Sequence, residues 1–154
     1  MKALFPGSFN PFTLGHYSIV ERALAMFPDG VVVAIGCNIA KEGSDAVADR
    51  LEQVRRAVAP LGPKVEVTAY GGLTVDAVAE TGAGCIVRGV RSVADYEYER
   101  TMADVNLRIG GVETVVLFAR PELEAVSSSL VRELRHYGRD VSWMLPPKKD
   151  IHTY

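Results

Sequence analysis

The sequence predicts a single α/β domain built on a five-stranded parallel sheet with helices on both faces. Short segments rich in β-branched residues alternate with amphipathic segments along the 154 residues. The expected strands begin near residues 2, 31, 65, 85 and 113, so successive starts lie about 20 to 34 residues apart, which is the size of one β-α unit. Alternation at this spacing is typical of a doubly wound, Rossmann-like sheet. The expected domain covers residues 1–154.

Each expected element follows from its own pattern. Apolar residues recur at helical spacing from Ile19 to Phe27, and Pro28-Asp29-Gly30 ends that helix. Residues 31–35 are apolar at every position, as in a central parallel strand that is buried on both faces. The expected strands are 3–5, 31–35, 65–67, 85–87 and 113–118. The expected helices are 19–27, 51–61, 74–80, 95–109 and 128–137.

Composition excludes several classes of protein. The chain has 17 Lys and Arg against 19 Asp and Glu, a net charge of −2, which argues against a nucleic-acid coat. Its longest apolar run, residues 31–37, is far too short to span a bilayer, and no signal-peptide core follows the N-terminus. Cys37 and Cys85 are expected to be two small buried thiols in a reducing compartment. We therefore expect a cytoplasmic protein that binds neither nucleic acid nor membrane.

The loop after the first expected strand combines residues that suit an anion. Gly7 lets backbone approach a ligand, Ser8 offers a hydroxyl, and Gly15-His16 lies at the mouth of the following helix. The alternative is a proline-rich turn with a surface histidine. Neither the Gly-Lys-Ser/Thr phosphate loop nor the three-glycine dinucleotide fingerprint is present.

Two further loops carry positive charge. Lys41 follows the second expected strand, where a lone lysine is ordinarily just solvated. Arg88-Gly89-Val90-Arg91 is expected immediately after the fourth strand and suits a phosphate, because guanidinium groups make paired hydrogen bonds to its oxygens. The alternative is a helix-entry turn, with the acids from Asp95 to Glu99 near the positive end of the helix dipole.

A serine run, Ser127-Ser128-Ser129, enters the last expected helix. One serine there is an ordinary N-cap, whereas three offer hydroxyl and N–H groups that would fit a polyphosphate. No cysteine nucleophile or carboxylate pair lies at an expected strand end, and His16 lacks the partners of a hydrolase triad. The four loops together predict a site for several phosphates.

These motifs resemble a known family. Residues 6–11, with Thr13-Leu14-Gly15-His16, resemble the nucleotidyltransferase superfamily signature, in which a second histidine often stands where Thr13 is. Residues 88–91, 95–99 and 127–133 resemble motifs of the bacterial phosphopantetheine adenylyltransferases. The similarity to that family covers nearly the whole chain. The resemblance implies transfer of the adenylyl group of ATP to 4′-phosphopantetheine, giving dephospho-CoA and pyrophosphate in coenzyme A synthesis. It also implies a homohexamer, binding of dephospho-CoA or CoA, and Mg²⁺ held mainly through substrate phosphates rather than by protein ligands.

The resemblance also implies roles for individual residues. The acceptor, 4′-phosphopantetheine, would be held by Ser8, Lys41, Thr74 and Arg88. ATP would be held by Ser8, Phe9, His16, Gly89, Val90, Arg91, Glu99, Leu123, Glu124, Ala125, Val126, Ser127, Ser128 and Ser129. The catalytic donors and charges would be His16, Lys41 and Arg91.

The chain departs from the family pattern at three places. Asn10 stands where an aspartate is common, and an aromatic residue is missing both from 42–45 and from 121–125. Three alternative functions stay open at this point. They are a nucleotidyltransferase for nicotinate mononucleotide or a sugar or polyol phosphate, an inactive module that senses CoA, and a structural subunit without a ligand.

Overall fold

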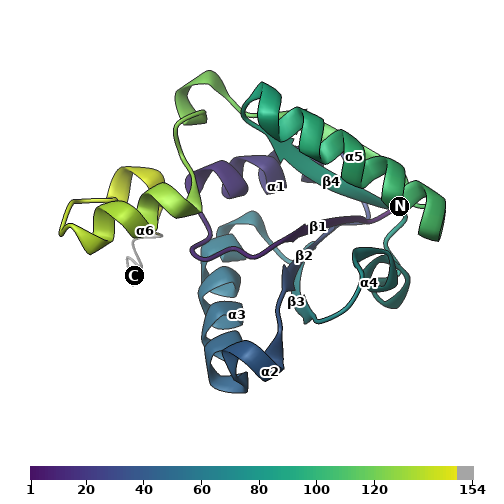
Figure 1. Ribbon diagram of the computed structural model, residues 1–154, viewed down its shortest axis with the longest axis horizontal. Helices are drawn as coiled ribbons and strands as arrows, with labels where there is room; N and C mark the ends of the chain where they lie inside the picture. Colours follow the sequence, from purple (N-terminus) through teal and green to yellow (C-terminus); the bar gives the residue numbers. More distant parts are fainter. Residues whose placement is uncertain (149–154) are drawn as a thin grey trace.

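The computed structural model describes residues 1–148 and contains one parallel five-stranded sheet (Figure 1). Its strands lie in the order β3-β2-β1-β4-β5, and all four neighbouring pairs are parallel. The strands are β1 (Ala3–Gly7), β2 (Val31–Gly36), β3 (Val65–Tyr70), β4 (Cys85–Val90) and β5 (Thr114–Phe118). The chain therefore builds one side of the sheet from β1 to β3 and then crosses to build the other, which confirms the doubly wound arrangement.

Helices cover both faces of this sheet, as predicted (Figure 1). On one face lie α1 (Leu14–Met26) and α3 (Ser44–Val58), and on the other α4 (Thr74–Thr81) and α5 (Val93–Gly110). The remaining elements are α2 (Ile39–Glu42), α6 (Ser128–His136) and the 3-10 turns η1 (Ala59–Leu61), η2 (Pro121–Leu123) and η3 (Ser142–Met144). Among the described helices none is long and apolar enough to cross a membrane.

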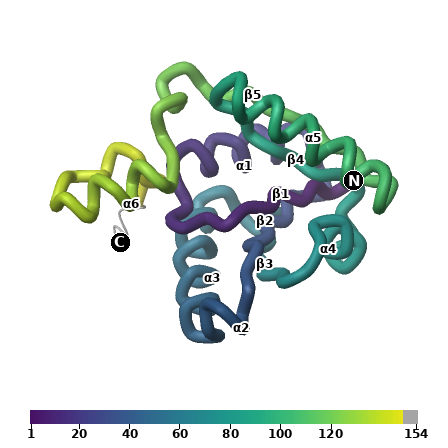
Figure 2. Tube along the Cα trace, in the orientation of Figure 1, coloured from purple at the N-terminus to yellow at the C-terminus, as the bar shows by residue number. Residues whose placement is uncertain are grey.

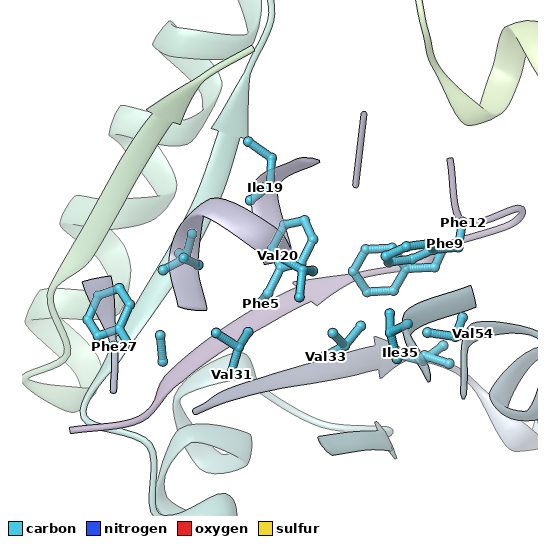
Figure 3. Packing of buried hydrophobic residues seen from close by; sticks show 14 of the residues in the cluster. Phe5, Phe9, Phe12, Ile19, Val20, Phe27, Val31, Val33, Ile35 and Val54 are labelled. Carbon is cyan, nitrogen blue, oxygen red and sulfur yellow. The ribbon is translucent and has the colours of Figure 1, made fainter. Parts of the chain in front are cut away.

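Alternating residues of β2 belong to two separate hydrophobic clusters, one on each face of the sheet. Val31, Val33 and Ile35 of β2 join the cluster under α1 and α3, together with Phe5 and Val20 (Figure 3). Val32 and Ala34 join the cluster under α4 instead. Each fully buried Val, Leu or Phe side chain contributes about 1.5–3 kcal/mol to folding. The continuous apolar run of β2 therefore stabilises this strand between the two layers of helices, as predicted.

Helix α6 lies to the side of the sheet, beyond the carboxyl ends of the strands (Figure 2). It has its own small cluster, made by Val126, Val131, Val141 and Met144. Two side chains attach it to the loop after β1. The Ser128 hydroxyl donates to the Pro11 carbonyl oxygen at 2.7 Å, and Arg132 donates to the carbonyl oxygen of Asn10. The last helix thus holds the first loop of the chain.

Several local predictions differ from the structure. Helix α1 begins at Leu14 and α3 at Ser44, which is five and seven residues before the segments expected from 19 and 51. Arg88, Gly89 and Val90 lie within β4, paired with Val116, Leu117 and Phe118 of β5, rather than in a loop after the strand. Lys41 lies on α2, a four-residue helix that was not predicted. The Asn38 side chain caps this helix by accepting a hydrogen bond from the Lys41 N–H. Cys85 is buried as expected but Cys37 is only partly buried, and both are free thiols.

Candidate active site

One cavity lies where the chain order of the sheet reverses, at the carboxyl ends of β1 and β4. Doubly wound sheets bind ligands at this position because the loops on either side diverge there. The cavity has a volume of about 290 Å³. Its wall is formed by the loops after β1, β4 and β5 and by the first turns of α1 and α6.

The wall of this cavity is positively charged. Arg88, Arg91 and Arg120 line it, and none of its lining residues is Asp or Glu. The N-termini of α1 and α6 also reach it, through Gly15-His16 and Ser127-Ser128-Ser129. Helix N-termini carry partial positive charge and free N–H groups. The cavity is therefore suited to a polyanion.

A tightly packed aromatic turn forms the floor below Ser8. Phe9 has a φ of 47°, which is unusual for a side chain of this size, and it is only 3% exposed. Its ring lies 5.2 Å from that of Phe5 and 5.4 Å from that of Phe12. A Cβ atom at Gly7 would come within 2.9 Å of the Phe9 ring, so any larger residue there would displace that ring. The turn that carries Ser8 is thus held in one shape.

His16 is fixed in a defined tautomer. The backbone N–H of Thr13 donates to His16 Nδ1 at 2.9 Å, and the Thr13 hydroxyl oxygen lies 3.2 Å from the same nitrogen. Because Nδ1 accepts a hydrogen bond, the ring proton of neutral His16 must lie on Nε2. Thr13 is also the N-cap of α1. One residue therefore both starts the helix and orients the imidazole.

His16 is also held in its neutral form. Burial, followed by the positive charges of Arg88 and Arg91, lowers the pKa of His16 from its ordinary 6.5 to about 4. The ring packs edge-on against Phe9, with ring centres 5.0 Å apart. At neutral pH the side chain is an uncharged hydrogen-bond donor.

Arg88 is engaged by two parts of the chain. Its Nε and Nη2 donate to the two carboxylate oxygens of Glu99 at 2.9 and 2.7 Å, and Nη1 donates to the carbonyl oxygen of Pro6. Glu99 comes from α5 and Pro6 from β1. The guanidinium group is thereby fixed between the strand that precedes His16 and the helix that follows β4.

A second cavity of about 190 Å³ lies on the other side of Arg88. Thr74, at the start of α4, lines it, and the Thr74 hydroxyl lies 3.1 Å from that of Tyr70. Glu99 and Asn106 of α5 line it as well. The two cavities share three lining residues, Pro6, Gly7 and Arg88. Two ligands could therefore meet end to end at the carboxyl ends of β1 and β4.

Arg91 lies at the rim of the larger cavity. Its backbone N–H donates to Asp95 Oδ2 at 3.0 Å, and its Nε lies 3.7 Å from the same oxygen. Its Nη1 donates to the carbonyl oxygen of Glu124 at 3.4 Å. The side chain is about 41% exposed, so it is held less firmly than Arg88.

The serine run combines both predicted roles. The Ser127 hydroxyl caps α6 by accepting from the Leu130 N–H at 3.1 Å, and the Ser128 hydroxyl is used by Pro11. All three serines nevertheless line the larger cavity. The capping interpretation is thus confirmed for Ser127. The first turn of α6, which Ser127 caps, also forms part of the cavity wall.

The structure brings most of the predicted site residues together. Ser8, Phe9, His16, Gly89, Val90, Arg91, Leu123, Val126 and the three serines line the larger cavity, Thr74 lines the smaller one, and Arg88 lines both. Glu99 lines only the smaller cavity, away from the expected ATP contacts. Glu124 and Ala125 line neither cavity, nor does Lys41, which is exposed on α2. The binding and catalytic roles of all these residues stay predictions.

Arg120 was missed by the sequence analysis. It follows the carboxyl end of β5 by two residues and lines the larger cavity. Unlike Arg88 and Arg91, it has no ion-pair partner within residues 1–148. Its place beyond a strand end was the signal that could have revealed it. Tyr70, the last residue of β3, carried the same signal, whereas Asn106 gave none because it lies inside α5.

The described part of the chain has no group of three or more His, Cys, Asp or Glu residues that could hold a metal ion. The larger cavity also lacks a carboxylate on its wall. This donor set does not form a protein cage for Mg²⁺, which prefers oxygen ligands. It does fit a Mg²⁺ ion that is carried by the phosphate oxygens of a nucleotide.

Comparison with known proteins places this site in a family. The cytidylyltransferase-like family profile matches residues 4–134. A phosphopantetheine adenylyltransferase of Porphyromonas gingivalis is 53% identical over 144 residues, covering 94% of this chain and 93% of that protein. The Bacteroides thetaiotaomicron protein of the same name is 45% identical over 151 residues, covering 98% and 99%.

The fold is also found in a more distant solved structure. A universal stress protein in complex with cAMP superposes with a TM-score of 0.51 at 16% identity, covering 77% of this chain and 96% of that one. At this identity the likeness concerns the arrangement of strands and helices alone.

Proposed function

Because this chain belongs to the phosphopantetheine adenylyltransferase family, we propose that it transfers the adenylyl group of ATP to 4′-phosphopantetheine, giving dephospho-CoA and pyrophosphate. The observation that carries this proposal is the pair of cavities that meet at Pro6, Gly7 and Arg88. The larger cavity, with two helix N-termini, suits the triphosphate. The smaller one, with Thr74 and Asn106, suits the phosphate end of the acceptor.

The reaction is an in-line displacement at the α-phosphorus of ATP. An oxygen of the acceptor phosphate forms the new bond to phosphorus, the bond to the bridging oxygen breaks, and pyrophosphate leaves with that electron pair. The attacking phosphate is already an anion at neutral pH, so the protein need not supply a general base. Bringing the two anions together in line contributes on the order of 7–11 kcal/mol.

His16 supplies a donor for the charge that builds on the α-phosphate. Its ring proton lies on Nε2, because Nδ1 accepts a hydrogen bond from the backbone N–H of Thr13. A preorganised donor of this kind is worth about 2.7–4 kcal/mol in the transition state. Since the ring is neutral, it donates without transferring its proton to the product.

The remaining charges bind and orient the two substrates. Arg88 faces both cavities, whereas Arg91 and Arg120 face only the larger one. Mg²⁺, held by phosphate oxygens of ATP, would neutralise part of the triphosphate charge. No covalent adenylyl-enzyme is needed, because the acceptor attacks ATP directly.

We also propose that the protein is a cytoplasmic homohexamer and that CoA or dephospho-CoA binds the same pair of cavities. Several apolar side chains on α5 and β5 are exposed in the single chain, among them Val93, Tyr98, Ile109 and Phe118. Exposed apolar patches mark contact surfaces between proteins. Light scattering of the purified protein should give six times the subunit mass, and a monomer would contradict the assembly.

The proposed adenylyl transfer is tested with a set of candidate acceptors. Pyrophosphate release from ATP is measured with 4′-phosphopantetheine, pantetheine, nicotinate mononucleotide, nicotinamide mononucleotide and glycerol 3-phosphate. We expect turnover only with 4′-phosphopantetheine. Pantetheine should fail because it lacks the attacking anion and leaves the Arg88 donors unpaired.

Other outcomes of the same panel would assign a different function. Turnover with a pyridine mononucleotide would make the protein a different nucleotidyltransferase. Tight binding of CoA without turnover of any acceptor would make it a CoA sensor. A protein that bound none of these ligands would be a structural subunit.

A further inference from the structure

Glu99 is an unusual residue for the helix that carries it. Helix α5 is largely exposed, and Glu99 is its one buried residue, with 6% of its surface accessible. Carboxylates are rarely buried unless they are paired, because burial disfavours the charged form. Both oxygens of Glu99 accept from Arg88, at 2.7 and 2.9 Å.

The bonds that Arg88 makes determine which of its donors are free. A guanidinium group has five N–H donors. Three of those of Arg88 are used, two by Glu99 and one by the carbonyl oxygen of Pro6. One N–H on each terminal nitrogen is left. The side chain that carries these two donors lines both cavities.

We propose that Glu99 is a positioning residue, which holds Arg88 so that its two free N–H groups meet the acceptor phosphate. This role rests on the proposed function of the site. It differs from the ATP contact that the family resemblance implies for Glu99. A long side chain that is already fixed loses less freedom when it binds, so the fixed fork binds phosphate more tightly than a mobile one.

A direct contact between Glu99 and ATP fits the geometry less well. Glu99 does not line the larger cavity, and its two oxygens already serve Arg88. Glu99 therefore acts on the reaction through Arg88 and on the acceptor side.

The test is a double-mutant cycle of Glu99→Gln, Arg88→Gln and the double variant, with Glu97→Gln as matched control. Glu97 is an exposed acid on the same helix and lines neither cavity. KM and kcat are measured for both substrates, and ATP binding is measured by calorimetry without acceptor. Wild-type turnover of 4′-phosphopantetheine is established first, so that failure of the proposed function is seen separately.

We expect Glu99→Gln to weaken binding of 4′-phosphopantetheine much more than binding of ATP. Glu99→Gln should raise KM for 4′-phosphopantetheine about 10- to 100-fold, the effect of losing one charge-assisted hydrogen bond. Its ATP affinity should change less than about threefold, and Glu97→Gln should behave as wild type. In the Arg88→Gln background, adding Glu99→Gln should cost little more, because the residue acts through Arg88.

Two results would overturn the proposal. One is a loss of ATP affinity in Glu99→Gln equal to or larger than the loss for the acceptor. The other is an additive cycle, in which Glu99→Gln is as harmful without Arg88 as with it. If Glu99→Gln does not fold, Glu99→Asp replaces it in the measurement of substrate affinities. That variant keeps the charge but reaches Arg88 less well, so it should show the same split in smaller measure.

Discussion

Acidification should destabilise the folded enzyme through His16. The pKa of His16 is lowered to about 4 in the fold, from an ordinary 6.5, because the ring is buried and lies near Arg88 and Arg91. Between these two values the unfolded chain binds a proton that the folded protein does not. The free energy of unfolding therefore falls as the pH drops from 6.5 towards 4. Above pH 6.5 the full stability is present.

The size of the effect follows from the two pKa values. One pKa unit corresponds to about 1.4 kcal/mol. His16 should then cost about 1.4 kcal/mol of stability at pH 5.5 and about 2.5 kcal/mol at pH 4.5, relative to pH 7.5. These values apply to His16 alone, so the assay must remove the contribution of other groups that titrate in this range.

The assay is urea unfolding of the wild type and of His16→Gln between pH 4.5 and 7.5. Glutamine does not titrate, so the difference in unfolding free energy between the two proteins isolates His16. We expect this difference to move by about 2–3 kcal/mol across the range, in the direction that favours the variant at low pH. A difference that stays constant with pH would show that His16 titrates normally in the fold, and the neutral-donor role would be refuted.

Three further predictions concern single residues of the larger cavity. His16→Ala should leave ATP binding nearly intact and lower turnover by about 10²–10³-fold, as expected for one lost transition-state donor; calorimetry and steady-state kinetics would contradict this role if ATP affinity fell and turnover did not. Arg91→Lys keeps the charge but loses the planar fork, so ATP affinity measured by calorimetry should fall, and an unchanged value would exclude a paired contact. Arg120→Gln should raise KM for ATP severalfold and leave KM for 4′-phosphopantetheine unchanged, since Arg120 lines only the larger cavity; a larger effect on the acceptor would place it in the wrong subsite.

The strands were predictable because their residues must be apolar wherever they are buried. Residues 31–35 of β2 lie between two helical layers, so every position faces a hydrophobic cluster. Helix ends were predictable where local chemistry sets them, as at Pro28-Asp29-Gly30 after α1. Ser127, which caps α6, is a local signal of the same kind. Patterns that depend on neighbours along the chain are visible in the sequence.

Contacts between distant residues were not predictable in this way. Glu99 on α5 pairs with Arg88 on β4, so the pair depends on how the helix packs against the strand. Arg120 approaches the cavity only because β5 lies beside β4. Each of these outcomes depends on tertiary packing, which no local pattern encodes.

The acids after β4 now have a physical explanation that joins the two interpretations of their motif. Asp95 and Glu99 are four residues apart on α5, so they lie on the same side of the helix. Asp95 contacts Arg91 and Glu99 contacts Arg88. Residues 88–91 and 95–99 thus form one unit, in which the helix orients the arginines of the strand end. Because the guanidinium groups of Arg88 and Arg91 are both paired, we expect the site to bind phosphate through directed N–H groups more than through excess charge. Of the three arginines on the wall, Arg120 alone has no ion-pair partner among residues 1–148.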